Sequence, residues 1–187
     1  MSAKTTPSRR GPTDRGRRDR LVEATIAVIA DRGVDGVTHR AVAAAAGVPL
    51  GSTTYHLGSR DELLETAMRA AADAYNRRLR EFLDALPDGA DLAAALADMI
   101  GHDIGPNRDR AIVEYELYLA ALRRPALRPA ATAWMADITD LIARRTDRVT
   151  ARAVAAAVDG LLLESLVADP PPTRADLLAV LRRVLAG

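Results

Sequence analysis

Residues 38–56 read THRAVAAAAGVPLGSTTYH, a pattern of two short helices separated by a glycine. Thr38 is a residue type favoured at helix N-caps, and Gly47 interrupts the alanine run that follows it. Pro49 suits the first position of the second helix, because an amide hydrogen would be unpaired there. The small side chains at 43–46 allow two helices to cross closely, so these proportions predict a helix-turn-helix.

The second predicted helix, residues 49–56, carries side chains that add little to a hydrophobic core. They are short or planar and mostly polar: Gly51, Ser52, Thr53, Thr54, Tyr55 and His56. Hydroxyl and imidazole groups on one helix surface can bond to phosphates and base edges. This surface therefore indicates DNA binding, and the alternative is an ordinary helix corner with a polar outer face.

A longer helix precedes this motif. Val22, Ile26 and Ile29 recur at spacings of four and three, which predicts a helix that starts near Arg17 and ends at Gly33. The N-terminal part of the chain is thus expected to contain three helices.

Helical patterns also fill the rest of the chain. Ser59 and Glu62 have capping-box spacing, and the long helix that they open is expected to continue until Pro87. Further helices are expected to begin at or near Leu92, Asn107, Pro125, Thr150 and Thr173. No segment alternates with the period of a strand, so the sequence predicts an all-α fold of about nine helices.

Composition limits the class of protein. The chain has 187 residues, of which 49% are hydrophobic, 27% charged and only 3% aromatic, which fits a folded helical protein and excludes an all-β sandwich. Without cysteine there is no disulfide framework and no thiolate site, and three histidines leave little for zinc. No apolar run is long enough to cross a membrane, and no signal peptide is evident. We expect a cytoplasmic protein without a membrane partner.

Charge is distributed unevenly although its sum is only +1. Residues 1–60 hold 10 basic and 5 acidic side chains, whereas the rest of the chain holds 16 and 20. The basic N-terminal part suits an anionic partner such as DNA. Residues 2–13 contain no large apolar side chain, and residues 1–13 are expected to form a disordered basic arm, which either adds sequence-independent DNA affinity or is simply a solvated tail.

The residues from Arg18 to Met68 resemble the DNA-binding domain of TetR-family transcriptional regulators. Many landmarks match at fixed spacing: Gly33, Gly36-Val37-Thr38, Ala43, Ala46-Gly47-Val48, Gly51-Ser52, Tyr55-His56 and Gly58 to Leu64. Thr53-Thr54 stands where the family usually has an aliphatic residue and a tyrosine, and Arg60 replaces the frequent lysine. The resemblance implies a helix-turn-helix domain at residues 14–60, followed by a ligand-binding and dimerisation domain at residues 61–187.

The resemblance also implies DNA contacts residue by residue. Thr38, at a helix N-terminus, is expected to bind a backbone phosphate. Arg40 and His39 match positions that reach base edges, where an arginine bidentate to guanine contributes about 1–3 kcal/mol of discrimination. The other expected contacts come from the recognition helix and the residues after it: Gly51, Ser52, Thr53, Thr54, Tyr55, His56 and Arg60.

In the C-terminal domain the resemblance implies a ligand pocket between the fourth and eighth helices. The candidates are Met68, Tyr75, Phe82, Met99, His102, Tyr115, Glu116, Tyr118, Trp134, Ile138, Leu161 and Glu164. Core packing is the alternative role for each of them. The two glutamates lie in mainly apolar segments, so either one would favour a cationic ligand if it faced a cavity, or else would pair with an arginine.

The last two helices are expected to form the dimer interface of this family. The segment 151–167 is rich in alanine and leucine and has Gly160 at its middle, where close helix approach would explain a residue that otherwise weakens a helix. The expected interface residues are Val158, Gly160, Leu162, Leu166, Leu177 and Leu181.

Together these features predict a homodimeric repressor that binds a pseudo-palindromic double-stranded DNA operator and leaves it when a small-molecule effector binds. No cofactor and no catalytic role are expected. The alternative is a helical dimeric DNA-binding regulator without a small-molecule ligand, which is controlled by a protein partner or acts as an activator. His102-Asp103 resembles the dyad of HD-type metal phosphohydrolases, but the further histidine and aspartate that such a site needs are not evident.

Overall fold

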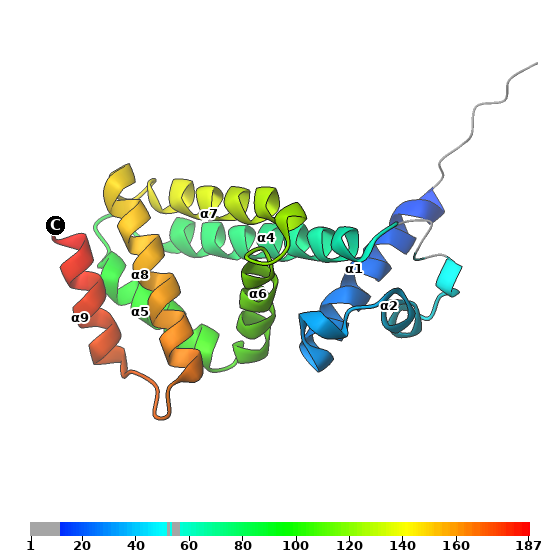
Figure 1. Cartoon of the computed structure of the whole chain (residues 1–187). Coiled ribbons are helices and arrows are strands. Elements are labelled where there is room, and N and C mark those ends of the chain that lie inside the picture. The colour runs from blue at the N-terminus through cyan, green and yellow to red at the C-terminus, as the bar shows by residue number, and fades with distance from the viewer. Residues whose placement is uncertain (1–11, 52, 54–56) are drawn as a thin grey trace, which may run out of the picture.

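The computed structural model describes residues 12–51, 53 and 57–187. Within these residues the chain forms eight α-helices and two short 3-10 helices, with no strand, which confirms the all-α prediction. Figure 1 shows α1 and α2 at one end of an elongated molecule and α8 and α9 at the other. The long helix α4 runs between the two ends.

The N-terminal unit contains α1 (Pro12–Arg32), η1 (Val34–Gly36) and α2 (His39–Ala46). Gly33 has φ 71° and ψ 173°, a conformation that is essentially open only to glycine, and it turns the chain between α1 and η1. Thr38 caps α2 as predicted, and Gly47 ends that helix with φ 63°.

Helix α4 (Arg60–Ala85) joins the N-terminal unit to the rest of the molecule. It begins with the predicted capping box, in which Ser59 and Glu62 bond to each other's backbone amides. Its first turns pack against α1, and its later turns pack against α7 (Arg128–Ile142), which runs alongside it in Figure 1. One continuous apolar core therefore extends along α4 from one end of the molecule to the other.

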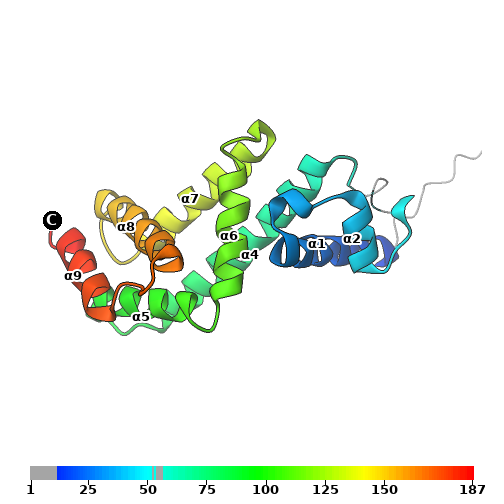
Figure 2. The same ribbon diagram turned by 60° about the horizontal axis from the view of Figure 1, so that its bottom comes forward.

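The C-terminal unit adds α5 (Leu92–Ile104), α6 (Arg108–Ala120), η2 (Pro125–Leu127), α8 (Arg148–Val167) and α9 (Arg174–Leu185). Helix α6 crosses α4 steeply and lies between the α1–α2 end and the α8–α9 end in both views (Figures 1 and 2). Helices α5, α8 and α9 pack on one another at the far end. Helix α6 therefore contacts both units, as α4 does.

Two details differ from the sequence-based expectation, and two predicted segments lie wholly or partly outside the described residues. Helix α1 already includes Pro12 and Thr13, which were expected in the disordered arm, and residues 1–11 of that expected arm lie outside the described residues. Asp147 caps α8 by accepting from the amides of Val149 and Thr150, and that helix therefore begins before Thr150. The predicted helix over 49–56 includes 52 and 54–56, which also lie outside the described residues.

Candidate functional site

The predicted DNA-reading surface is partly described. Thr38 is exposed, and its hydroxyl oxygen accepts a hydrogen bond from the amide of Ala41 at 3.1 Å, so its own hydrogen can still be donated to a phosphate. Arg40 and Gly51 are exposed, while His39 is half-buried. Four expected contacts lie outside the described residues: Ser52, Thr54, Tyr55 and His56.

Thr53 lies inside the domain rather than on the predicted DNA surface. It is fully buried, and its hydroxyl donates to the carbonyl oxygen of Leu50 at 2.7 Å. Burial of residue 53 could have been predicted from the resemblance, because the family usually has an aliphatic residue at this position. Thr53 therefore fills an apolar site with its polar group satisfied locally.

Arg60 also differs from its predicted role as a phosphate ligand. Its guanidinium donates to the carbonyl oxygens of Val34 at 2.9 Å and Asp35 at 3.1 Å, and it lies 3.3 Å from the Asp35 carboxylate. These contacts attach η1 to the first residue of α4. We therefore assign Arg60 to the internal structure of the N-terminal unit.

Glu116 connects the two units of the molecule. Its carboxylate accepts a hydrogen bond from the amide of Val34 at 2.7 Å, so it faces η1 and not the predicted ligand pocket. Beside it, Arg124 forms an ion pair with Asp61 at 2.8 Å. The two contacts hold α6 and the loop after it against η1 and the start of α4.

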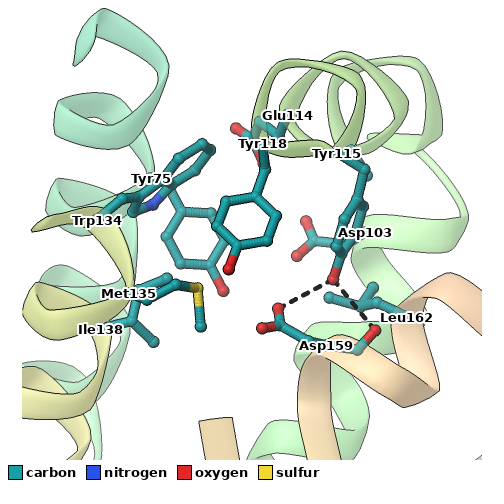
Figure 3. A pocket seen from close by; sticks show the side chains of 11 residues that line it. Tyr75, Asp103, Glu114, Tyr115, Tyr118, Trp134, Met135, Ile138, Asp159 and Leu162 are labelled. Carbon is teal, nitrogen blue, oxygen red and sulfur yellow. Dashed lines mark hydrogen bonds between the residues drawn. The ribbon is translucent and has the colours of Figure 1, made fainter. Parts of the chain in front are cut away.

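A small cavity lies between α4, α6, α7 and α8. Its lining residues are Tyr75, Asp103, Ala111, Glu114, Tyr115, Tyr118, Trp134, Met135, Ile138, Asp159 and Leu162 (Figure 3). Five of the predicted pocket residues are brought together here: Tyr75, Tyr115, Tyr118, Trp134 and Ile138. The cavity volume is about 30 Å³, enough for about two water molecules.

Aromatic rings form one side of this cavity. Trp134 packs edge-on against Tyr75, with ring centroids 5.9 Å apart, and against Tyr118, with centroids 6.4 Å apart. The indole N–H of Trp134 is buried and has no hydrogen-bond partner among the described residues. A buried donor without a partner is costly, so this side of the cavity is better suited to a bound molecule than to apolar packing alone.

Three carboxylates, none of them predicted, line the same cavity. Asp103 pairs with Arg110 at 2.5 Å, and Glu114 lies 2.5 Å from Arg78 and 3.7 Å from Arg110. The third is Asp159, which accepts a hydrogen bond from the Tyr115 hydroxyl at 3.1 Å.

Burial raises the pKa of all three carboxyl groups. The arginines oppose this rise in the pKa of Asp103 and of Glu114, whereas only the Tyr115 hydrogen bond opposes it for Asp159. Burial also raises the pKa of Tyr75 and Tyr115, so both hydroxyls remain protonated donors at neutral pH.

A larger open groove of about 380 Å³ adjoins this cavity. Tyr75 and Asp103 line both spaces and therefore form the wall between them. Three other predicted pocket residues lie in the groove: Phe82, Met99 and His102. Of the remaining candidates, Met68 and Leu161 are buried but line neither space, and Glu164 is exposed on α8.

The His102-Asp103 pair does not have the surroundings of a metal site. Asp103 forms an ion pair with Arg110. The described part of the chain contains no cluster of three His, Cys, Asp or Glu side chains that could hold a metal ion. In the same part of the chain, no helix is long and apolar enough to cross a membrane.

The outer surface of α8 differs from the predicted interface. The predicted Val158, Leu162, Leu177 and Leu181 are buried inside the subunit, Leu166 is half-buried, and Gly160 is exposed. A stripe of small or β-branched residues on α8 is exposed instead, and we name it the α8 stripe: Val149, Ala153, Ala156, Gly160 and Val167. Val149 and Val167 are 81% and 85% exposed. Periodicity alone could not tell which apolar face of α8 turns inward.

Sequence profiles match both units of the chain. Residues 21–67 match the profile described as bacterial regulatory proteins of the tetR family, and residues 87–187 match the tetracyclin repressor-like C-terminal domain. The HTH-type transcriptional regulator PksA of Bacillus subtilis (strain 168) is 28% identical over 172 residues, which cover 82% of this chain and 80% of PksA.

Solved structures are more similar in sequence. The multidrug binding protein EbrR complexed with ethidium is 44% identical with a TM-score of 0.81, and the match covers 90% of this chain and 98% of that one. A TetR-family member from Streptomyces coelicolor A3 is 45% identical with a TM-score of 0.79 over the same shares of the two chains. The chain therefore belongs to the TetR family of bacterial transcriptional regulators and is a DNA-binding regulator rather than an enzyme.

Proposed function

We propose that this protein is a homodimeric repressor that leaves its operator when a small molecule occupies the cavity between α4, α6, α7 and α8. One observation carries this proposal. Helix α6 supplies Tyr115 and Tyr118 to the cavity and, from its other side, Glu116 to the amide of Val34 in the N-terminal unit. A ligand that moves α6 thereby changes how the two units are held together.

The small size of the cavity makes such movement necessary. Its 30 Å³ cannot hold a molecule with even one aromatic ring, so a ligand has to push side chains apart. Tyr75 separates the cavity from the 380 Å³ groove, and its rotation would join the two spaces. Because protein interiors are close-packed, this expansion moves the helices that carry the lining residues.

Displacement of α6 then alters the N-terminal unit. It changes the position of Glu116 relative to Val34 and the position of Arg124 relative to Asp61. In a dimer the two recognition helices must be spaced to enter successive major grooves, about 34–36 Å apart. A ligand that prefers the expanded conformer lowers operator affinity in proportion to that preference.

The lining favours an aromatic cation as the ligand. Aromatic faces attract cations, and carboxylates neutralise them; Tyr75, Tyr118 and Trp134 supply the faces, while Asp159 supplies a carboxylate. The similar protein EbrR has been crystallised with ethidium, with proflavin and with malachite green. All three dyes are aromatic cations.

The α8 stripe supports the homodimer. Its exposed residues are spaced by four, three, four and seven positions, which are multiples of about one helical turn, so they lie along one side of α8. A Cβ added at Gly160 would meet no atom within 4 Å inside the subunit, so packing within the subunit does not require glycine there. Close approach of a second α8 would require a small residue at this position, since small residues let helix backbones come near each other.

The test is fluorescence anisotropy with DNA from upstream of the protein's own gene, at two salt concentrations and with competitor DNA. Tetraphenylphosphonium serves as the ligand because it is an aromatic cation that does not intercalate into DNA. We expect specific binding that survives the competitor and weakens on addition of the cation. If the cation binds the protein and operator affinity does not change, the alternative of a regulator without ligand control is favoured.

A further inference from the structure

The three carboxylates of the cavity differ in what neutralises them. Asp103 and Glu114 lie beside Arg78 and Arg110, so these four side chains together carry no net charge. Asp159 has no basic partner among the described residues. It accepts its side-chain hydrogen bond from the neutral Tyr115 hydroxyl. The uncompensated charge of the cavity is therefore one negative charge, located on α8.

The position of Asp159 suits a counter-charge for a ring-containing ligand. Figure 3 shows Asp159 across the cavity from Trp134, with Tyr118 between them and Tyr115 beside the carboxylate. A ring packed against Trp134 or Tyr118 could direct a positive group toward the Asp159 oxygens. Tyr115 would hold the carboxylate in place, since its single hydroxyl hydrogen is shared between Oδ1 of Asp159, at 3.1 Å, and the backbone carbonyl oxygen of Asp159, at 3.3 Å.

We infer, on the basis of the proposed ligand-responsive function, that Asp159 is the specificity-determining residue for a ligand with one positive charge, and that the ligand competes with a proton for this carboxylate. Asp159 is half-buried, and no basic side chain among the described residues stabilises its charge. A bound cation supplies the missing partner, as Arg110 does for Asp103. An uncharged ring system gains nothing from Asp159.

The pH dependence follows from the surroundings of Asp159. The titratable and charged groups of the cavity and the adjoining groove are Tyr75 and Arg78 from α4, Asp98, His102 and Asp103 from α5, and Arg110, Glu114, Tyr115 and Tyr118 from α6; α7 contributes Trp134, Met135 and Ile138, which do not titrate. Burial raises the pKa of Asp159 above its ordinary 3.8. Below the raised pKa the carboxyl is neutral, so affinity for a cation rises as the pH increases through it.

The experiment measures ethidium binding to the intact protein by fluorescence, without DNA, from about pH 4.5 to about pH 8. Ethidium keeps its charge over this range. The matched uncharged probe is N-phenyl-1-naphthylamine. For the wild type we expect ethidium affinity to rise with pH and to reach a plateau, while affinity for the uncharged probe stays constant.

Two variants test the role of Asp159. In Asp159→Asn, ethidium affinity at the plateau pH should fall about 10- to 100-fold, the value of a hydrogen bond to a charged group, and its dependence on pH should become weaker than in the wild type. In Tyr115→Phe, loss of the donor should move the midpoint of the pH dependence upward, since that hydrogen bond lowers the Asp159 pKa. Asp73→Asn, the same change at an exposed position on α4, is the control.

Binding of the uncharged probe shows that each variant is folded with its cavity intact. The inference is overturned if Asp159→Asn binds ethidium as tightly as the wild type, or if it retains the wild-type pH dependence. It is also overturned if the wild type binds the uncharged probe but not ethidium. In that last case the proposed repressor function still stands, because release from DNA by an uncharged ligand is measured separately.

Discussion

The carboxylate of Glu116 accepts a hydrogen bond from the backbone amide of Val34 at 2.7 Å, although 82 residues separate them in sequence. Glu116 lies on the side of α6 turned away from the cavity, and Val34 begins η1 in the N-terminal unit. The bond therefore joins the helix that lines the cavity to the unit that carries the DNA-reading surface.

Replacement of Glu116 should uncouple ligand binding from DNA release. Allosteric coupling between two sites is typically about 1–3 kcal/mol. In Glu116→Ala we expect the ratio of operator affinities with and without tetraphenylphosphonium to move toward one, while the affinity for the cation itself stays near the wild-type value. Anisotropy titrations with both ligands measure the two quantities.

Glu116→Gln is the matched control for this prediction. The glutamine amide oxygen can still accept from the Val34 amide, so its coupling should remain close to that of the wild type. A wild-type ratio in Glu116→Ala would show that α6 communicates with the N-terminal unit by another route.

Arg60→Ala should reduce stability without changing the salt dependence of DNA binding. Its bonds to the carbonyl oxygens of Val34 and Asp35 are internal, and the partly exposed guanidinium makes their loss worth about 1 kcal/mol. A phosphate contact would instead lower the slope of log affinity against log salt by about 0.9. Titrations at several salt concentrations and a thermal melt separate these two roles.

Gly33→Ala should destabilise the junction between the two units. The backbone at Gly33 has φ 71°, and an added Cβ would lie 3.2 Å from the Glu116 carboxylate. We expect a loss of about 1–3 kcal/mol in the free energy of unfolding, measured with a denaturant. Gly16→Ala is the control, because a Cβ at that position in α1 meets no atom within 4 Å. Equal stability of the two variants would contradict the account of Gly33.

Ala156→Glu should dissociate the proposed dimer while leaving the subunit folded. Ala156 is exposed within the subunit, so the glutamate harms no intrachain packing, but in a dimer it would place a charge against the second α8. Light scattering after size-exclusion chromatography should show a monomer, and operator affinity should fall. Ala133→Glu, at an exposed position on α7, should remain a dimer. A dimeric Ala156→Glu protein would place the interface elsewhere.

The fold could be predicted from the sequence because its signals are local. Capping by Ser59 with Glu62, and by Thr173, depends on residues within one turn, and both capping boxes are present in the structure. The predicted start of α8 at Thr150 was wrong. Asp147, three residues earlier, accepts the hydrogen bonds of the amides of Val149 and Thr150, so the helix begins at Arg148.

The cavity and the exposed surface of α8 could be predicted only in part, because they depend on how each helix is rotated about its axis. Both Asp159 and Glu164 interrupt an apolar segment of α8, yet only Asp159 lines the cavity, and Glu164 is exposed. Likewise the larger side chains of α8, such as Leu162, are buried in the core, which leaves small residues such as Gly160 outside. Tertiary packing, and not helix propensity, decides this rotation.

If α6 couples the cavity to the operator, the coupling must be thermodynamically reciprocal. Tetraphenylphosphonium affinity is measured by calorimetry with and without bound operator, and operator affinity is measured by anisotropy with and without the cation. We expect each ligand to weaken the binding of the other by the same factor, about 5- to 150-fold. Tight binding of the cation in the cavity with no change in operator affinity would contradict this coupling.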